Sequence, residues 1–300
     1  MTGSMSKEHH YSYSTLTLSF DGPLATITLN RPDKRNAISF QLVDELVHAL
    51  AAVERSHARV LILTGAGKAF CSGMDLDDLR AMAGLSLEES QDDAIRQARL
   101  MRTLFRTLYD FPMVTIAAVN GPAIAGGCGL ATLCDFTLAS TAAKFGYTEV
   151  RIGFIPAIVS TFLVRQVGEK QARDLLLTGR IISADEAYRL GLANEVVAAD
   201  KLLERAHELA ATLLQNCPTS LMTTKRLLKN YSAKELDREL EAAVEENARI
   251  RLTEDFREGL SSFLEKRNRA GQGDRASARA APFWEPSWGK TKSGKVHDFT

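Results

Sequence analysis

Residues 114–140 read VTIAAVNGPAIAGGCGLATLCDFTLAS, and this stretch indicates a strand, a glycine-containing turn, a short helix and a second strand. The run Val114–Val119 is apolar except for Thr115, which is typical of a buried strand. Residues 126–133 follow as a short helix and residues 136–139 as the next strand. Strands that alternate with helices in this way predict an α/β protein.

The residues before this stretch extend the same pattern. Two β-rich runs, 15–20 and 24–30, are separated by Asp-Gly-Pro at 21–23, which predicts a hairpin. Ser39 can cap a helix whose apolar residues recur at helical spacing up to position 53. Residues 60–63 then form a short apolar strand, so the first 65 residues are predicted to fold as β-β-α-β.

A long helix is predicted at 89–109, ended by Phe111-Pro112, and a last short strand at 196–197. The pattern from residue 199 onward is almost purely helical, with helices expected at 199–216, 219–230, 234–251 and 254–267. We therefore divide the chain into a disordered leader at 1–13, a core at 14–198, a helical region at 199–267 and a basic, flexible tail at 268–300. Periodicity alone leaves open whether the helical region packs on its own core or on a neighbouring subunit.

Composition excludes several functional classes. The 37 basic and 37 acidic residues of the 300-residue chain balance, which argues against a whole-chain footprint for nucleic acid. The four cysteines show no zinc spacing and there is no HExxH motif, so no metal is expected. No apolar run reaches the ~20 residues that span a bilayer, and the N-terminus lacks the apolar segment of a secretory signal. We expect a cytoplasmic protein with reduced thiols.

Two glycine-containing turns are candidates for ligand binding. They lie at 68–76 (KAFCSGMDL) and 120–129 (NGPAIAGGCG), each between a predicted strand and a helix. Glycine lets the backbone approach a ligand closely, and a helix start presents unpaired N–H groups. Two such turns facing each other would aim two donors at one oxygen. The structural alternative is an ordinary strand-to-helix turn, because neither segment has nucleotide-binding spacing.

Glu149 is the third candidate. It lies among aromatic and aliphatic residues in KFGYTEVRIGFIP (144–156), where burial would raise its pKa toward the range useful for a general acid or base. The alternative is a surface carboxylate paired with Arg151.

Six segments, in order, resemble the crotonase (enoyl-CoA hydratase/isomerase) family. They are NRPDKRNAIS (30–39), KAFCSGMDL (68–76), AAVNGPAIAGGCGLATLCDFTLAS (117–140), FGYTEVRIGFIP (145–156), LLTGRIISADEAYRLGLANEVV (176–197) and TEDFREGLSSFLEKR (253–267). The resemblance implies a crotonase fold, in which repeated ββα turns form a spiral core before a C-terminal helical region. It also implies that this region mediates trimerisation, giving a homotrimer or a hexamer.

The resemblance assigns roles to individual residues. The backbone N–H groups of Met74 and Gly126 would form an oxyanion hole for the thioester of an acyl-CoA, and Glu149 would transfer the proton. Substrate and CoA contacts are expected at Ala37, Gly73, Asp75, Gly127, Gly129, Phe263 and Lys266. For the last two, a core aromatic and a solvated lysine are equally good interpretations. No cofactor is implied, because coenzyme A is part of the substrate.

The chain departs from the best-known hydratases at Gly129, where they carry a first catalytic glutamate. We expect this glycine to leave space for water. Ala157 stands where related hydrolases and dienoyl-CoA isomerases carry an acid, which disfavours both activities. A single-glutamate hydratase is favoured, acting on branched, methylglutaconyl-type substrates that the combination of GGCGL with TEVRIGFIPAIVS resembles. The alternatives are an isomerase that uses Glu149 as its sole proton shuttle and a family member that binds RNA or acts as a scaffold.

Overall fold

The computed structural model describes residues 12–83 and 87–267. Its main sheet has six strands in the order β1-β2-β3-β4-β6-β9. These are β1 (Leu16–Asp21), β2 (Leu24–Leu29), β3 (Val60–Gly65), β4 (Val114–Val119), β6 (Phe136–Ser140) and β9 (Glu195–Val197). The β1–β2 hairpin is antiparallel and the other neighbours are parallel. Each strand predicted from the sequence is therefore present in this one sheet.

A second, three-stranded sheet was not predicted. It consists of β5 (Ala123–Ile124), β7 (Lys144–Gly146) and β8 (Ile182–Ser183) in the order β5-β7-β8. An isolated bridge joins Cys71 to Ala123, and another joins Ile38 to Met74. These pairings draw the loops that follow β3 and β4 together beside the second sheet, where both glycine-containing turns lie.

The core helices are α1 (Phe40–Glu54), α2 (Leu76–Ala83), α3 (Leu87–Tyr109), α4 (Gly126–Thr132), α5 (Ala157–Thr178) and α6 (Ala184–Leu190). The Ser39 hydroxyl caps α1 by accepting the Leu42 N–H at 3.1 Å, as the sequence predicts. The sequence predicts neither α5 nor α6. Within α5, Gly168 adopts φ 74° and ψ 163° and interrupts the helix, so its apolar residues do not follow one uninterrupted stripe.

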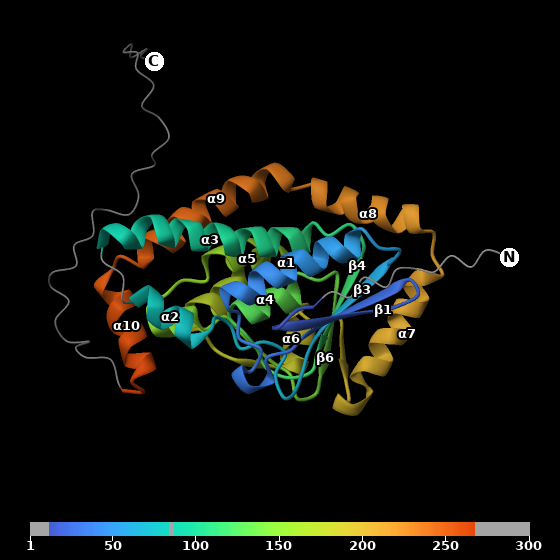
Figure 1. Cartoon of the computed structure of the whole chain (residues 1–300), viewed down its shortest axis with the longest axis horizontal. Helices are drawn as coiled ribbons and strands as arrows, with labels where there is room; N and C mark the ends of the chain where they lie inside the picture. Colours follow the sequence, from blue (N-terminus) through green and yellow to red (C-terminus); the bar gives the residue numbers. More distant parts are fainter. Residues whose placement is uncertain (1–11, 84–86, 268–300) are drawn as a thin grey trace, which may run out of the picture.

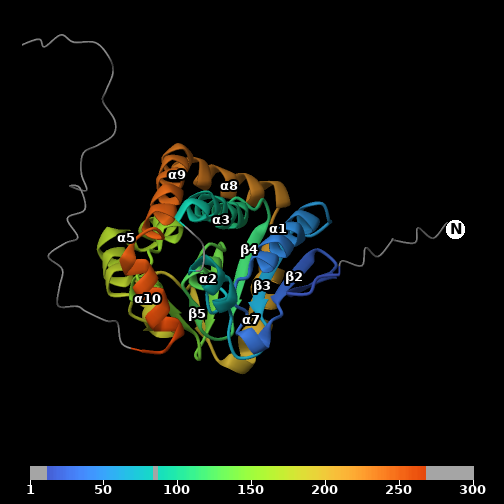
Figure 2. The same ribbon diagram turned by 60° about the vertical axis from the view of Figure 1, so that its left-hand side comes forward.

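Four helices, α7 (Leu202–Leu214), α8 (Pro218–Asn230), α9 (Ala233–Ile250) and α10 (Glu254–Leu264), form the C-terminal region. All four agree with the sequence prediction. Buried residues of α7 pack on the outer face of the main sheet, against apolar side chains of β3, β4 and β6. Helix α9 lies along α3 and α5, and α10 packs against α2 (Figures 1 and 2). The helical region thus folds back over its own core.

Ion pairs fix α9 to the core helices. Arg102 of α3 pairs with Glu241 at 2.6 Å, and Arg165 of α5 pairs with Glu239 at 2.6 Å. Partly exposed pairs such as these each contribute about 1 kcal/mol or less, so they define the position of α9 more than they stabilise it. The apolar contacts of Leu236, Leu240 and Ala243, which belong to the main core, hold the helix down.

Candidate active site

A cavity of about 790 Å³ lies between the core and the C-terminal helices. Its wall is formed by the segment before α1, the turn leading into α2, the start of α4, the segment 148–159, the end of α9 and Phe263 of α10. This volume is typical of a pocket for an organic ligand. The folding back of α9 and α10 closes one side of the cavity, so the helical region is part of the site.

Glu149 lies in the wall of this cavity. It begins the short 3-10 helix η2 (Glu149–Ile152), its exposed fraction is only 9%, and its Oε2 has no hydrogen-bond partner within the described part of the chain. Burial is the main influence, and it raises the pKa of Glu149 from 4.5 to about 7. A carboxyl group with this pKa can both accept and return a proton near neutral pH. The alternative of a surface carboxylate is wrong, because the side chain is buried.

Two glycines hold the Glu149 segment against α10. Gly153 ends η2 at φ 73°, and a Cβ at this position would lie 2.2 Å from the carbonyl oxygen of Asp255. From the other side, a Cβ on Gly259 would lie 2.4 Å from the carbonyl oxygen of Ile152. Only glycine allows this backbone-to-backbone approach, so the packing of α10 determines where Glu149 sits.

Met74 presents the first candidate N–H donor. The flanking residues are paired, because the Ile38 N–H donates to the Gly73 carbonyl at 2.7 Å and the Asp75 N–H donates to the Ile38 carbonyl at 2.9 Å. The Met74 N–H itself makes no backbone hydrogen bond to a residue that the structure describes. Gly73 has φ 87°, a left-handed conformation that favours glycine, and Met74 lines the cavity.

Gly126 presents the second candidate donor. It is the first residue of α4, where N–H groups have no partner inside the helix. The preceding residue, Ala125, adopts φ 51° and ψ −125°, which is a strained conformation for a residue with a Cβ. The Ala125 N–H donates to the Gly146 carbonyl at 2.7 Å, and the Ile124 N–H donates to the Cys71 carbonyl at 2.9 Å. These bonds hold the strained turn in place and direct the Gly126 N–H.

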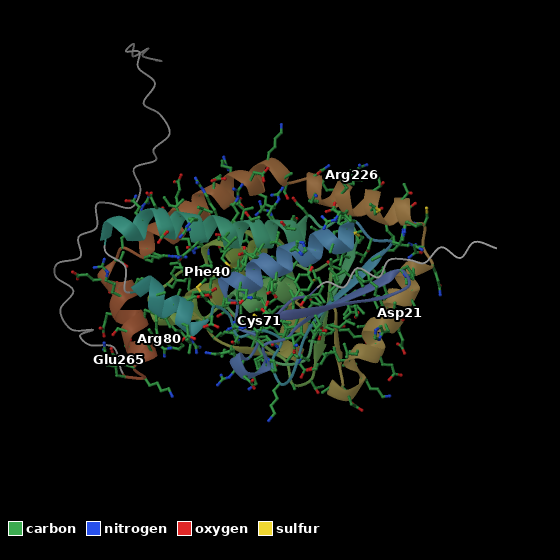
Figure 3. All side chains as sticks on the ribbon, viewed as in Figure 1. Asp21, Phe40, Cys71, Arg80, Arg226 and Glu265 are labelled. Carbon is green, nitrogen blue, oxygen red and sulfur yellow. The ribbon has the colours of Figure 1, made fainter. Side chains whose placement is uncertain are left out.

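The two turns are in contact. A Cβ on Gly73 would lie 3.1 Å from the Ala125 Cβ, and Cys71, in the interior of the molecule, bridges to Ala123 (Figure 3). Both Met74 and Gly126 line the cavity that Glu149 also lines. The arrangement can hold a carbonyl oxygen between two fixed donors while a carboxyl group moves a proton nearby.

Only some of the other residues predicted to contact the substrate lie in the cavity wall. Ala37, Asp75 and Phe263 line the cavity, whereas Gly73, Gly127, Gly129 and Lys266 do not belong to its described wall. Asp75 pairs with Arg31 at 2.7 Å and accepts the Asp77 N–H at 2.9 Å, so its carboxylate braces the turn. A Cβ on Gly127 would lie 2.3 Å from the Cys71 carbonyl oxygen, which makes this glycine a requirement of packing.

The expected space at Gly129 is absent. A Cβ at this position would lie 2.6 Å from Cγ1 of Val159 and 3.4 Å from Cζ of Phe105. Val159 and Phe105 line the cavity in its place. The prediction of room for water beside Gly129 is therefore wrong, because a side chain from α5, which was not predicted, occupies it.

Two polar residues of the wall, Asn247 and Arg251, were not predicted from the sequence. Asn247 lies in the last turn of α9 and Arg251 directly follows this charged helix, where a polar residue is normally solvated, but both are buried here. Their spacing of four places them on one helix face, but periodicity cannot show that this face borders a cavity.

Among the described residues, no group of three or more His, Cys, Asp or Glu side chains could hold a metal ion, and none of the described helices is long and apolar enough to cross a membrane.

The fold and the cavity define an α/β enzyme in which a buried acid and two candidate backbone donors line one cavity. The sequence profile described as Enoyl-CoA hydratase/isomerase matches residues 20–272, and the chain belongs to this family. A Thermus thermophilus protein is 45% identical over 82% of this chain and 96% of its own length. The short-chain-enoyl-CoA hydratase of Clostridium acetobutylicum is 34% identical over 86% and 97%, respectively. A solved enoyl-CoA hydratase/isomerase from Xanthobacter autotrophicus is 31% identical, with a TM-score of 0.77 over 86% of this chain and 98% of that one. These findings confirm the predicted crotonase fold.

Proposed function

We propose that this protein is an enoyl-CoA hydratase that adds water across the 2,3 double bond of an enoyl-CoA. The hydroxyl group goes to C3 and a hydrogen to C2, which gives a 3-hydroxyacyl-CoA. The observation that carries the proposal is the position of Glu149, buried with a pKa of about 7 in the same cavity as Met74 and Gly126. Similarity to proteins named enoyl-CoA hydratases favours hydration among the reactions of the family.

The mechanism uses one carboxyl group for both proton transfers. The thioester oxygen accepts hydrogen bonds from the N–H groups of Met74 and Gly126. The Glu149 carboxylate takes a proton from water as the water oxygen bonds to C3, and the π electrons move to the thioester oxygen as an enolate. The two donors stabilise that negative charge more than the neutral carbonyl, an effect worth ~10²–10³ in rate for each donor. Glu149 then returns the proton to C2, so atoms and charge balance.

The substrate is proposed to be a branched, methylglutaconyl-type acyl-CoA. The combination of GGCGL at 126–130 with TEVRIGFIPAIVS at 148–160 supports this class, and the buried wall offers apolar surface from Met101, Phe105 and Val159. The exposed residues of the wall include Lys34, Arg35 and, on α2, Arg80; Lys34 and Arg80 both pair with Asp77. A phosphorylated nucleotide suits this exposed basic part, with Ala37 and Phe263 as further CoA contacts. No separate cofactor enters the mechanism.

Assembly into trimers or hexamers is part of the proposal. The α8 helix carries Met222, Leu227 and Leu228 as exposed apolar side chains, and Tyr231 follows it, 74% exposed. An apolar surface of this kind is typical of a protein contact. Light scattering on the purified protein would give the mass of the assembly. We also propose that the assembly is cytoplasmic.

An isomerase is the second candidate, because a single carboxyl group also suffices to carry a proton from C2 of a 3-enoyl-CoA to C4. The two reactions differ in whether water enters the product. We expect the 3-hydroxyacyl-CoA formed in ¹⁸O-labelled water from a 2-enoyl-CoA or 3-methylglutaconyl-CoA to carry the label. Conversion of a 3-enoyl-CoA to the 2-enoyl-CoA, with no hydroxylated product from any substrate, would instead establish the isomerase.

A further inference from the structure

Asn36 is a fully buried amide beside the first donor turn. Its exposed fraction is 0%, and its φ of 55° is left-handed, as is the φ of 52° at the preceding residue, Arg35. Asparagine adopts this conformation more readily than most residues, but two such residues in succession are strained. Strain of this kind persists only where the surrounding contacts enforce it. The contacts of Asn36 therefore indicate what the strained turn serves.

The side chain of Asn36 joins two separate segments of the chain. Its Oδ1 accepts the Arg31 N–H at 2.9 Å, within its own turn. Its Nδ2 donates to the carbonyl oxygens of Ala66 and Ala69 at 2.9 and 2.8 Å, in the loop that follows β3. A Cβ on Gly65 would lie 2.8 Å from this Nδ2, so the amide fits directly against the end of β3. The amide thus fixes the loop after β3 to the segment before α1.

The segment that contains Asn36 also holds the first candidate donor, Met74. The Ser72 N–H donates to the Arg35 carbonyl at 3.1 Å. Ile38 bonds to both neighbours of Met74, through its N–H on one side and its carbonyl on the other. Because these two bonds go to the neighbours, the Met74 N–H points away from Ile38. The direction of this donor is therefore set by the segment 35–38.

We propose that Asn36 is a positioning residue for the oxyanion hole. Its amide fixes the loop after β3 to the segment 35–38 and so places the Met74 N–H relative to the Gly126 N–H. The inference rests on the proposed function, because it concerns the thioester oxygen that these two donors bind. Asn36 does not belong to the described wall of the cavity, so it acts through the backbone and not on the substrate. A misplacement of about 1 Å that arises away from the reacting atoms can cost about 10²-fold in rate.

Two variants remove the amide in different ways. Asn36→Asp keeps the shape and the acceptor for the Arg31 N–H, but it turns an oxygen toward the carbonyls of Ala66 and Ala69. Asn36→Gly removes the side chain and favours the left-handed φ, so it should fold even if Asn36→Asp does not. We expect each variant to lower kcat by about 10²-fold and to change KM by no more than about 3-fold. The reason is that the Met74 N–H stabilises the charge of the transition state more than the bound carbonyl.

Thr15→Val is the matched control. Thr15 is also buried, and its hydroxyl donates to Glu45 Oε2 at 2.6 Å, so the isosteric valine likewise removes a hydrogen bond of a buried side chain. Thr15 directly precedes β1 and does not belong to the described wall of the cavity. This variant should unfold at a lower urea concentration than wild type but keep the wild-type kcat.

The infrared carbonyl stretch of bound butyryl-CoA, labelled with ¹³C at the thioester carbon, reports the donors without any turnover. Hydrogen bonds polarise a carbonyl and lower its stretching frequency, so Asn36→Asp and Asn36→Gly should raise the frequency relative to wild type. Thr15→Val should leave it unchanged. A wild-type frequency in a folded Asn36→Gly overturns the proposal whatever the rate, and so does the failure of both variants to fold, which would assign the amide to folding alone. A raised frequency with an unchanged rate, or a wild-type protein that hydrates no enoyl-CoA, would instead contradict the proposed function.

Discussion

Gly73 and Ala125 meet where the two donor turns touch, and both have positive φ angles, 87° and 51°. A Cβ on Gly73 would lie 3.1 Å from the Ala125 Cβ. Each of these residues directly precedes a candidate oxyanion donor, Met74 or Gly126. The contact therefore sets the separation of the two N–H groups, and the strain at Ala125 is the local cost of that geometry.

Gly73→Ala should lower kcat/KM by about 10²-fold, because the new methyl group displaces one turn from the other and misplaces the Met74 N–H. The strained φ should also lower the free energy of unfolding by about 1–2 kcal/mol. Gly22→Ala is the matched control, since Gly22 has φ 54° with nothing within 4 Å of the added Cβ. It should lose similar stability but keep full activity, as measured by urea unfolding and steady-state kinetics. Equal activity in both variants would show that the contact does not position the donor.

Glu149→Gln should reduce turnover by about 10²–10⁴-fold, because it retains the shape of the side chain and removes its proton-transfer capacity. Binding of a saturated acyl-CoA, measured by calorimetry, should stay within a few-fold of wild type. A variant that keeps more than about a tenth of the wild-type rate would mean that another group transfers the proton.

The pH dependence of the rate follows from the raised pKa of Glu149, about 7. Hydration begins with Glu149 as a carboxylate, so kcat/KM should rise about 10-fold for each pH unit below 7 and level off above it. A profile measured on a substrate that has no free carboxylate isolates this group. A midpoint near 4.5, the ordinary value, would mean that Glu149 is solvated in the working enzyme.

The same pKa has a consequence for stability with a definite sign. The folded protein holds the Glu149 proton more tightly than the unfolded chain, so this contribution is fully present below about pH 4.5 and is lost as the pH rises to about 7. Glu149→Gln removes the dependence. The variant should be more stable than wild type by up to about 3 kcal/mol at pH 8 and by much less at pH 4.5, as chemical unfolding at the two pH values would show. A constant difference would contradict a buried carboxyl group.

The main sheet and the C-terminal helices could be predicted because their signals are local. A continuous apolar run such as Val60–Leu63 or the regular spacing along α9 is visible within one element. The second sheet could not, because β5 and β8 have two residues each and exist only through pairing with β7. Helix α5 escaped prediction because Gly168 divides it.

The same distinction between local and long-range signals applies to the residues of the candidate active site. Glu149 and both turns are marked by their own neighbours in sequence, so they could be proposed in advance. The environments of Arg251 and Gly129 depend on residues far away in the chain. Arg251 meets Gln97 of α3, and Gly129 meets Val159 of α5. Knowledge of the tertiary packing was required for both.

The contact between Gly129 and Val159 yields a last prediction. Gly129→Ala places a Cβ 2.6 Å from Val159 Cγ1, and the valine cannot swing away easily because its branched Cβ restricts χ1. This overpacking should lower the free energy of unfolding by about 1–3 kcal/mol. Val159→Ala should cost a similar amount for the opposite reason, since it leaves a void.

The double variant Gly129→Ala/Val159→Ala should cost less than the sum of the two single changes by at least about 1 kcal/mol, because the methyl group added at 129 enters the space vacated at 159. Urea unfolding of all four proteins measures this coupling. Strict additivity would show that the two side chains do not compete for one space.

If they do compete, Val159 blocks the side chain that Gly129→Glu introduces. This single variant should then either not fold or hydrate no faster than wild type. In the Val159→Ala background the same glutamate gains room beside Phe105 and the cavity, and hydration of straight-chain substrates should then exceed that of Val159→Ala alone. Two neighbouring carboxylates repel each other, so we expect the introduced glutamate and Glu149 to share one proton. Sharing raises the apparent pKa of the pair, and the lower limb of the pH–rate profile should therefore move above pH 7.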